Sequence, residues 1–278
     1  MLVFLRLIFK YFGVDINVKV NYTQLPNRLM RATFLGVGGW VSMPWLNHPS
    51  ILIETSDARL LVDAGEGSYR LLRRCLNLDV DALDAIVVTH SHGDHILGLP
   101  SYVLMAGSRG LRLNVIAPRQ AIDDLMAIIK ATHIQQYASS LNPMPVEVPS
   151  EPTLVARFKG TSIYVVGVNH TVEAMAVKVV DSSGSCITYS GDTAPSRQLV
   201  DLARGCGALI HEASGNPGFE EEAHRHGHST VNDAVKAAVE AGVGLLVLTH
   251  FYTLNPVIKG TGGLSVVVPY ECSTIEVT

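Results

Sequence analysis

The sequence predicts a layered α/β sandwich, and three features of the 278-residue chain lead to this prediction. In both halves, short apolar segments of strand type alternate with segments of helical period. With 47% hydrophobic and 17% charged residues, the chain can bury a large core. A stretch with three prolines, residues 138–151, indicates the join between two halves. We therefore expect an N-terminal extension over residues 1–30 and one domain of two pseudo-symmetric halves over residues 31–278.

The first half is expected to begin with strands and to alternate with helices after the third strand. Runs of apolar and β-branched residues predict strands at residues 31–37, 50–54, 59–63, 85–89 and 111–116. Helices are expected at residues 68–76, from residue 96 onward, and from about 120 to 137. Ser68 is a suitable N-cap for the first of these helices.

The second half continues the alternation. Strands are predicted at residues 161–168, 174–180, 186–189, 208–210 and 244–249. Helices are expected at residues 195–204, where a proline stands at the helix start, and at residues 229–241. The second of these carries small apolar residues along one face, which is typical of a helix packed on a sheet.

Charge and cysteine content narrow the function classes. A net charge of −4 with 21 lysines and arginines argues against a dedicated nucleic-acid binder. A local basic face formed by the arginines of the first half stays an alternative. The cysteines at 75, 186, 206 and 272 form no CxxC pair. We expect a reduced, cytoplasmic protein whose cysteines are small core residues.

The apolar start of the chain, Met1–Phe12, is too short to span a bilayer and carries Arg6. No small-residue cleavage site follows it, so it does not resemble a signal peptide. We expect it to make a protein contact, within the chain or in a homodimer, and we expect no membrane anchor.

One loop concentrates the chemistry. Thr89–His95 holds three histidines and one carboxylate in the six positions from His90 to His95, between a predicted strand and a predicted helix. In an extended loop His90 and His92 point the same way, while Asp94 and His95 can face a second point at the turn into the helix. Imidazole and carboxylate together suit zinc, manganese or iron.

Other predicted strands also end in residues of metal-ligand type. Asp63, His170, Asp192 and His250 each follow an apolar strand, as His90 does. Residues at strand ends can converge at one edge of a sheet, so the sequence predicts a shared metal site there.

These segments resemble a known family. Thr89–His95 resembles the HxHxDH signature of the metallo-β-lactamase superfamily, and four further segments resemble its other motifs in the same order. Those segments are Leu61–Gly67, Val168–His170, Ser190–Thr193 and Leu248–Phe251. His211–Ser214 and Gly227–Thr230 resemble the HEAT and HST motifs of its ribonuclease Z-like branch, which includes tRNA 3′-processing endonucleases and small phosphodiesterases.

The resemblance implies a four-layer αββα fold and a site for two divalent metal ions, zinc first, with manganese or iron as alternatives. One metal would be held by His90, His92 and His170. The other would be held by Asp94, His95 and His250, with Asp192 bridging the two. Asp63 would support the ligand loop from behind.

The implied reaction is hydrolysis of a phosphodiester or related phosphate ester by a metal-bridging hydroxide. Asp94, His228 and Glu212 are the expected catalytic residues. His228 would donate a proton to the departing oxygen while Glu212 accepts a hydrogen bond from its other nitrogen. The alternative for His228 is that it caps or packs the helix that follows. His48 and Tyr252 are candidate substrate contacts.

Two departures from the branch bear on the substrate. Only 21 residues separate His170 from Asp192, which leaves no room for the long arm with which some of these enzymes grip tRNA. The sequence after His250 also lacks the serine-arginine run usual in those enzymes. Both departures favour a small phosphate ester over nucleic acid. The alternatives are an armless tRNA 3′-endonuclease, a lactone, carboxylester or sulfate-ester hydrolase, and a non-catalytic metal-binding module.

Overall fold

The computed structural model describes residues 9–11, 14–16, 29–252 and 256–277. Most of the N-terminal extension, and with it most of the predicted protein contact of Met1–Phe12, lies outside these residues. Its described part is an antiparallel pair, β1 (Phe9–Tyr11) and β2 (Val14–Ile16). Within the described ranges, no helix combines the length and the apolar character that crossing a membrane requires.

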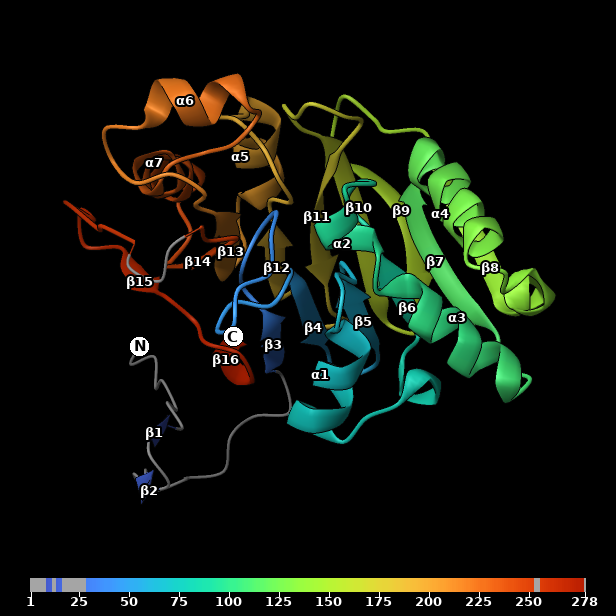
Figure 1. Cartoon of the computed structure of the whole chain (residues 1–278). Coiled ribbons are helices and arrows are strands. Elements are labelled where there is room, and N and C mark those ends of the chain that lie inside the picture. Colours follow the sequence, from blue (N-terminus) through green and yellow to red (C-terminus); the bar gives the residue numbers. More distant parts are fainter. Residues whose placement is uncertain (1–8, 12–13, 17–28, 253–255, 278) are drawn as a thin grey trace.

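Two seven-stranded sheets form the centre of the molecule (Figure 1). The first has the order β16-β3-β4-β5-β6-β7-β8 and the second has the order β15-β14-β13-β12-β11-β10-β9. The first contains β3 (Met30–Gly36), β4 (Ser50–Glu54), β5 (Arg59–Val62), β6 (Ala85–Val87), β7 (Leu113–Pro118), β8 (Leu141–Val146) and β16 (Ser273–Val277). The second contains β9 (Thr153–Phe158), β10 (Thr161–Gly167), β11 (Met175–Val180), β12 (Cys186–Tyr189), β13 (Ala208–Glu212), β14 (Leu245–Thr249) and β15 (Ser265–Val267).

Helices flank both sheets, so the predicted αββα layering is confirmed (Figure 1). In the first half the helical elements are α1 (Ser68–Leu76), η1 (Val80–Ala82), α2 (Gly93–Ile96), α3 (Leu99–Ser108), α4 (Arg119–Ala131) and η2 (Gln135–Ser140). In the second half they are α5 (Arg197–Ala203), α6 (Glu220–Arg225) and α7 (Val231–Ala241). Helix α1 packs on β3 and α4 on β7 and β8, whereas α5 and α7 pack on strands of the second sheet.

The alternation of side chains along the strands builds two cores. In β3, Phe34 faces the core between the sheets, while its neighbour Leu35 faces the core under α1, α3 and α4. Ile51 and Leu52 divide in the same way in β4. Because both faces of each sheet are covered, these strands are apolar on both sides, which is why they read as continuous apolar runs in the sequence.

Three predicted elements differ from the structure. The helix expected to reach residue 137 ends at Ala131 and gives way to η2, with His133 between them at a φ of 56°. Ser68 is not an N-cap, because the cap position is Gly67 at a φ of 80°, which suits glycine. The proline-rich join contains the edge strand β8, which tolerates Pro143 and Pro145 because residues two apart direct their missing N–H groups to the same, open side.

The expectation of reduced cysteines is wrong, because the structure pairs all four as disulfides. Cys75 is bonded to Cys272 and Cys186 to Cys206, with Cα–Cα distances of 5.2 and 4.8 Å. The first pair is 197 residues apart in sequence. This disulfide forms because β16 lies beside β3, which packs against α1. The spacing of the cysteines alone does not reveal that the last strand returns to this position.

Asp79 joins three elements of the first helical layer, and we expect Asp79→Ala to lower the free energy of unfolding by about 1–3 kcal/mol. Its carboxylate accepts hydrogen bonds from the Val80 N–H, the Tyr69 hydroxyl and the guanidinium groups of Arg73 and Arg109, at 2.8–2.9 Å. Removal leaves these donors without their acceptor. Urea denaturation measures the change.

Glu147→Ala is the matched control, because the Glu147 carboxylate pairs with Arg119 on the exposed surface. That pair should contribute little to the free energy of unfolding, because solvent screens exposed ion pairs. Equal losses for the two variants would contradict a structural role for the Asp79 network.

Candidate metal centre

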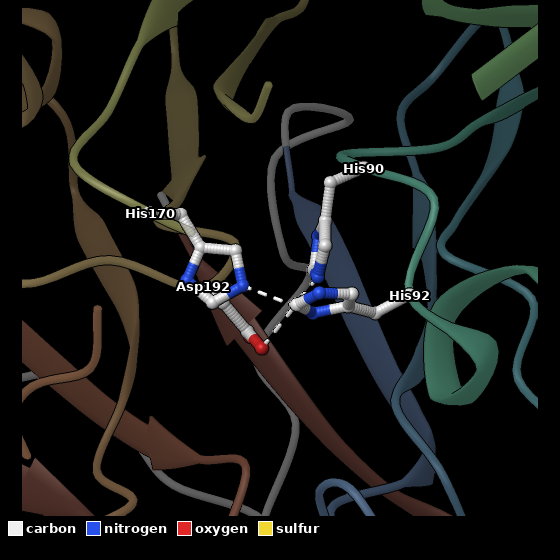
Figure 2. Close-up of side chains that lie close together, drawn as sticks. All are labelled: His90, His92, His170 and Asp192. Carbon is white, nitrogen blue, oxygen red and sulfur yellow. Dashed lines mark hydrogen bonds and ion pairs between the residues drawn. The ribbon is translucent and has the colours of Figure 1, made fainter. Parts of the chain in front are cut away.

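The residues of metal-ligand type meet where strands from both sheets end. His90 and His92 lie in the loop between β6 and α2, and His170 follows β10. Asp192 follows β12 and His250 follows β14. Figure 2 shows the side chains of His90, His92, His170 and Asp192 directed toward one another from these different segments. The convergence predicted at a sheet edge therefore occurs in the folded chain.

The first group of side chains consists of His90, His92, His170 and Asp192, each offering one donor atom within 4.8 Å of the others (Figure 2). His170 Nε2 lies 3.1 Å from His92 Nδ1, and His90 Nε2 lies 3.7 Å from Asp192 Oδ2. His90 and Asp192 are buried, whereas His92 and His170 are half-buried. One side of this group is therefore open to solvent.

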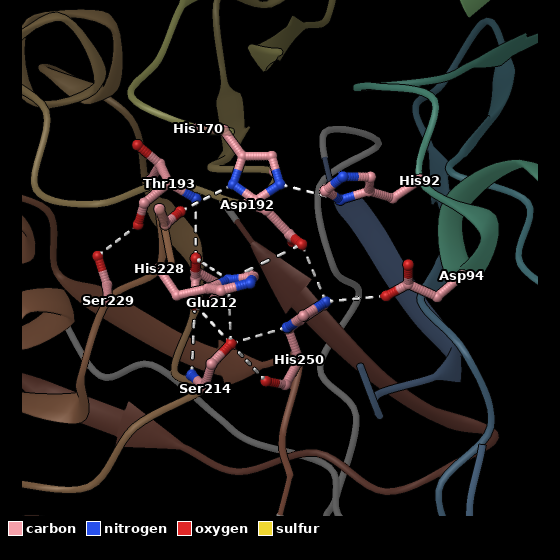
Figure 3. A network of polar contacts seen from close by, with 12 residues as sticks. His92, Asp94, His170, Asp192, Thr193, Glu212, Ser214, His228, Ser229 and His250 are labelled. Atoms are coloured by element: carbon pink, nitrogen blue, oxygen red, sulfur yellow. Dashed lines mark hydrogen bonds and ion pairs between the residues drawn. The ribbon is translucent and has the colours of Figure 1, made fainter. Parts of the chain in front are cut away.

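The second group consists of Asp94, His95, Asp192 and His250, and all four are buried. His250 Nε2 lies 3.2 Å from Asp94 Oδ2 and 3.1 Å from Asp192 Oδ2. His95 Nε2 lies 3.4 and 3.3 Å from the same two oxygens. Asp192 belongs to both groups, as expected of a bridging carboxylate (Figure 3).

The donor atoms of these groups fit divalent metal ions. His90 Nε2, His95 Nε2 and Asp192 Oδ1 are buried without a hydrogen-bond partner among the described residues. Buried polar atoms are normally paired, so three unpaired atoms at one point indicate a missing partner. Burial, reinforced by the neighbouring imidazoles, lowers the pKa of His90 well below its ordinary value. The neutral ring then keeps a lone pair for a metal.

Hydrogen bonds to the Nδ1 atoms of two histidines orient their rings. His95 Nδ1 donates to Asp63 Oδ2 at 2.7 Å, and Asp63 Oδ1 also accepts from the Thr89 N–H at 2.8 Å. His170 Nδ1 donates to the Gly227 carbonyl at 2.8 Å. With Nδ1 engaged, His95 and His170 present Nε2 to the centre. Asp63 thus lies where the sequence placed it, whereas Gly227 was not singled out although it belongs to a quoted motif.

Glu212 and His228 form a buried pair beside the two groups (Figure 3). His228 Nδ1 donates to Glu212 Oε1 at 3.0 Å. Burial acts to lower the pKa of His228, but the Glu212 carboxylate and this hydrogen bond outweigh it, and the pKa is raised. His228 does not cap the following helix, because α7 is capped by Thr230 and Asp233. The capping part of that alternative is therefore wrong, and packing against the helix start stays an alternative.

Glu212 is fully engaged by neighbours other than a metal. Its Oε1 also accepts from the Thr193 N–H at 2.8 Å, and its Oε2 accepts from the Ser214 hydroxyl at 2.7 Å. Ser214 Oγ in turn lies 2.9 Å from His250 Nδ1. Glu212, His228 and His250 lie close enough to hold an ion, but these bonds occupy the Glu212 oxygens. We therefore interpret Glu212 as the residue that orients His228 and, through Ser214, His250.

The two candidate substrate contacts lie in different surroundings. His48 is 7% exposed, and both of its ring nitrogens are buried without a hydrogen-bond partner among the described residues. Tyr252 is 44% exposed, and its ring centre lies 6.5 Å from that of His228 and 6.4 Å from that of His250. This exposed position beside two histidines of the site suits a substrate contact. Trp40, which the sequence did not indicate, is also exposed, with its ring 5.6 Å from that of His92.

Comparison with known proteins identifies a common family. A family described as Beta-lactamase superfamily domain matches residues 58–251. A ribonuclease Z from Pyrobaculum neutrophilum is 32% identical over 82% of this chain and 88% of the relative. Zinc phosphodiesterase ELAC protein 2 from Homo sapiens is 31% identical over 78% of this chain, which spans only 29% of that relative.

Solved structures agree on the fold. The crystal structure of the short form of human tRNase Z (ELAC1) superposes with a TM-score of 0.75, covering 89% of this chain and 99% of the other. The two sequences are 21% identical, so this likeness bears on the fold alone.

Proposed function

The chain belongs to the metallo-β-lactamase superfamily, in its ribonuclease Z-like branch, and from this premise we propose that its metal centre cleaves phosphodiester bonds in RNA. It is a metal-dependent hydrolase of phosphodiester bonds, which sets aside a non-catalytic metal-binding module. The observation that carries the proposal is the sharing of Asp192 by two ligand groups, with the Glu212–His228 pair beside them.

The proposed ligands divide between two divalent cations, zinc first, with manganese or iron as alternatives. His90, His92 and His170 would hold one, Asp94, His95 and His250 the other, and Asp192 both. Such a pair of ions supplies Lewis acidity that lowers the pKa of water and clamps the attacking and leaving oxygens of a phosphoryl group. Imidazole and carboxylate donors match this choice of metals.

The chain's own residues would move the protons. His228, held by Glu212 through Nδ1, keeps Nε2 free to give a proton to the departing alkoxide. Asp94, buried beside His95 and His250, places a second carboxylate where an attacking water can donate a hydrogen bond. The acid and the base thus come from different elements, the loop before α7 and helix α2.

Two observations support different substrates. The relatives named ribonuclease Z support RNA, and the expected preference for a small phosphate ester has no support among them. The short connection from His170 to Asp192 favours a compact substrate, because β11 and β12 are joined by the tight turn 181–185 with no arm. A small phosphodiester, such as a cyclic nucleotide, is therefore the second candidate.

A turnover panel tests the proposal. Protein reconstituted separately with zinc, manganese or ferrous iron would be given precursor tRNA, short linear RNA, cyclic nucleotides, a lactone, a carboxylester and a sulfate ester. We expect hydrolysis of RNA phosphodiesters that a chelator abolishes and added metal restores. Turnover of the carboxylester, lactone or sulfate ester without any phosphodiester would contradict the proposal, and turnover of cyclic nucleotides alone would replace RNA by the second candidate.

The assembly and location of the chain stay predictions. A homodimer is proposed, and light scattering over a range of protein concentrations tests it. A cytoplasmic location is also proposed, but disulfides persist mainly in oxidising compartments or in the cells of hyperthermophiles. Alkylation of thiols at the moment of cell lysis tests the cytoplasmic location, since a reducing cytoplasm should leave all four cysteines labelled.

A further inference from the structure

The loop between β3 and β4 exposes an unusual set of apolar side chains beside the metal centre. Four of its residues are about half exposed: Trp40 (57%), Val41 (59%), Met43 (45%) and Trp45 (59%). Contiguous exposed apolar side chains indicate a binding surface. Of the two tryptophans, Trp40 contacts the centre, because its ring meets the ring of His92 edge-on at 5.6 Å.

The backbone fixes Trp40 in this position. The Gly39 N–H donates to the Phe251 carbonyl at 3.3 Å, which ties the loop to the residue after His250. A Cβ at Gly39 would lie 2.4 Å from a ring carbon of His250, so only glycine lets the loop approach this closely. Trp40 itself has a φ of 29°, a conformation that residues with a side chain rarely adopt. Such strained positions persist where the surroundings impose them, often at functional sites.

Two aromatic rings therefore lie beside different histidines of the centre. Figure 3 shows these histidines, His92 and His228, with Asp192 between them. Trp40 lies next to His92, and Tyr252 lies next to His228. Within the described ranges, no lysine or arginine forms an ion pair with the proposed ligands, whereas aromatic rings lie beside two of the site histidines.

We propose that Trp40 is a stacking platform for the nucleobase that adjoins the scissile phosphate. This inference rests on the proposed function and makes it more specific, because it assigns a preference for base-bearing diesters over diesters without a base. Every nucleobase has a π-face, so stacking on tryptophan selects for the presence of a base and not for its identity. Trp40 acts here as a specificity residue and not as a proton donor or a ligand.

Binding is tested by fluorescence, which needs no turnover. The chain has two tryptophans, so Trp45→Phe leaves Trp40 as the only reporter and Trp40→Phe leaves Trp45. Metal-reconstituted protein would be titrated with adenosine 5′-monophosphate and with ribose 5-phosphate. We expect the nucleotide to quench emission in Trp45→Phe protein only, and ribose 5-phosphate to change neither variant. Quenching of both reporters alike, or of neither, would overturn the proposal.

Kinetics tests the consequence for specificity. The substrates are a dinucleotide and a diester with the same leaving group but an abasic ribose. Trp40→Ala should raise KM for the dinucleotide roughly 10-fold, in the range expected for one stacked base, and leave the abasic diester unchanged. Trp40→Phe should retain most of the preference. Trp45→Ala is the matched control, since this residue is as exposed and belongs to the same loop.

The outcomes separate this inference from the proposed function. Dinucleotide cleavage without any effect of Trp40→Ala would overturn the platform and leave phosphodiester hydrolysis intact. Nucleotide quenching of Trp40 without phosphodiester turnover would retain the platform and overturn the proposed reaction. If Trp40→Ala lowers metal content, or dissociates an oligomer while nucleotides have no effect, the side chain is part of the wall or of a subunit interface and the inference is wrong.

Discussion

Asp192→Ala protein should lose both metal ions, or keep one of them weakly held. The Asp192 carboxylate belongs to both ligand groups and lies 3.1 Å from His250 and 3.3 Å from His95. A single carboxylate between two cations screens each from the other, so its removal leaves their repulsion uncompensated. Metal analysis after dialysis, with the unchanged protein alongside, measures the content per chain.

The thermal stability of the same variant provides a second measurement. Metal ions that bind only the folded chain raise its melting temperature by mass action, so added zinc should stabilise the unchanged protein more than Asp192→Ala. Asp201→Ala is a control on the exposed face of α5, and it should respond to zinc as the unchanged protein does. Two tightly held ions per chain in Asp192→Ala would refute the bridging assignment.

His228→Ala should lose most turnover of substrates with poor leaving groups while keeping its metals. A positioned proton donor contributes about 10²- to 10⁴-fold to such reactions. Substrates with a nitrophenolate leaving group need little protonation, and we expect a loss of less than about 10-fold for them. The measurement is kcat/KM for both kinds of diester, together with metal content.

Two further variants sharpen this test. Glu212→Gln should show a milder form of the same pattern, because it weakens the 3.0 Å hydrogen bond that holds His228. His226→Ala is the matched control, since that imidazole is exposed and pairs with Glu222 on α6. If His228→Ala lowers kcat/KM equally for substrates with good and with poor leaving groups, the residue is not a proton donor. If the variant loses metal, the residue is a ligand.

Strands and ligand positions could be predicted from the sequence because both depend on local patterns. The segments 50–54 and 186–189 carry apolar side chains on both faces, and the structure forms β4 and β12 there. The proposed ligands follow such strands, and neighbouring parallel strands bring their ends to one edge. The pairs β5–β6 and β13–β14 are parallel, so His90 and His250 follow strands whose neighbours run the same way.

What the sequence did not predict depends on contacts between distant segments. Strand β16 pairs with β3 although most of the chain separates the two strands, and no local sequence pattern predicts this pairing. The Cys75–Cys272 pair follows from that return. The position of Trp40 likewise depends on how Gly39 approaches His250, a contact between two segments that lie far apart in sequence.

The bond between Cys75 and Cys272, which are 197 positions apart in sequence, turns most of the chain into a covalent ring. All of the proposed metal ligands, from His90 to His250, lie inside this ring, and only the stretch before Cys75 and the last residues lie outside it. A protease that cuts the ring once would therefore release no fragment, and the two new ends would stay tethered around the metal centre. A pull applied to the two termini would pass through the disulfide and bypass the segment from His90 to His250, which holds all of the proposed ligands.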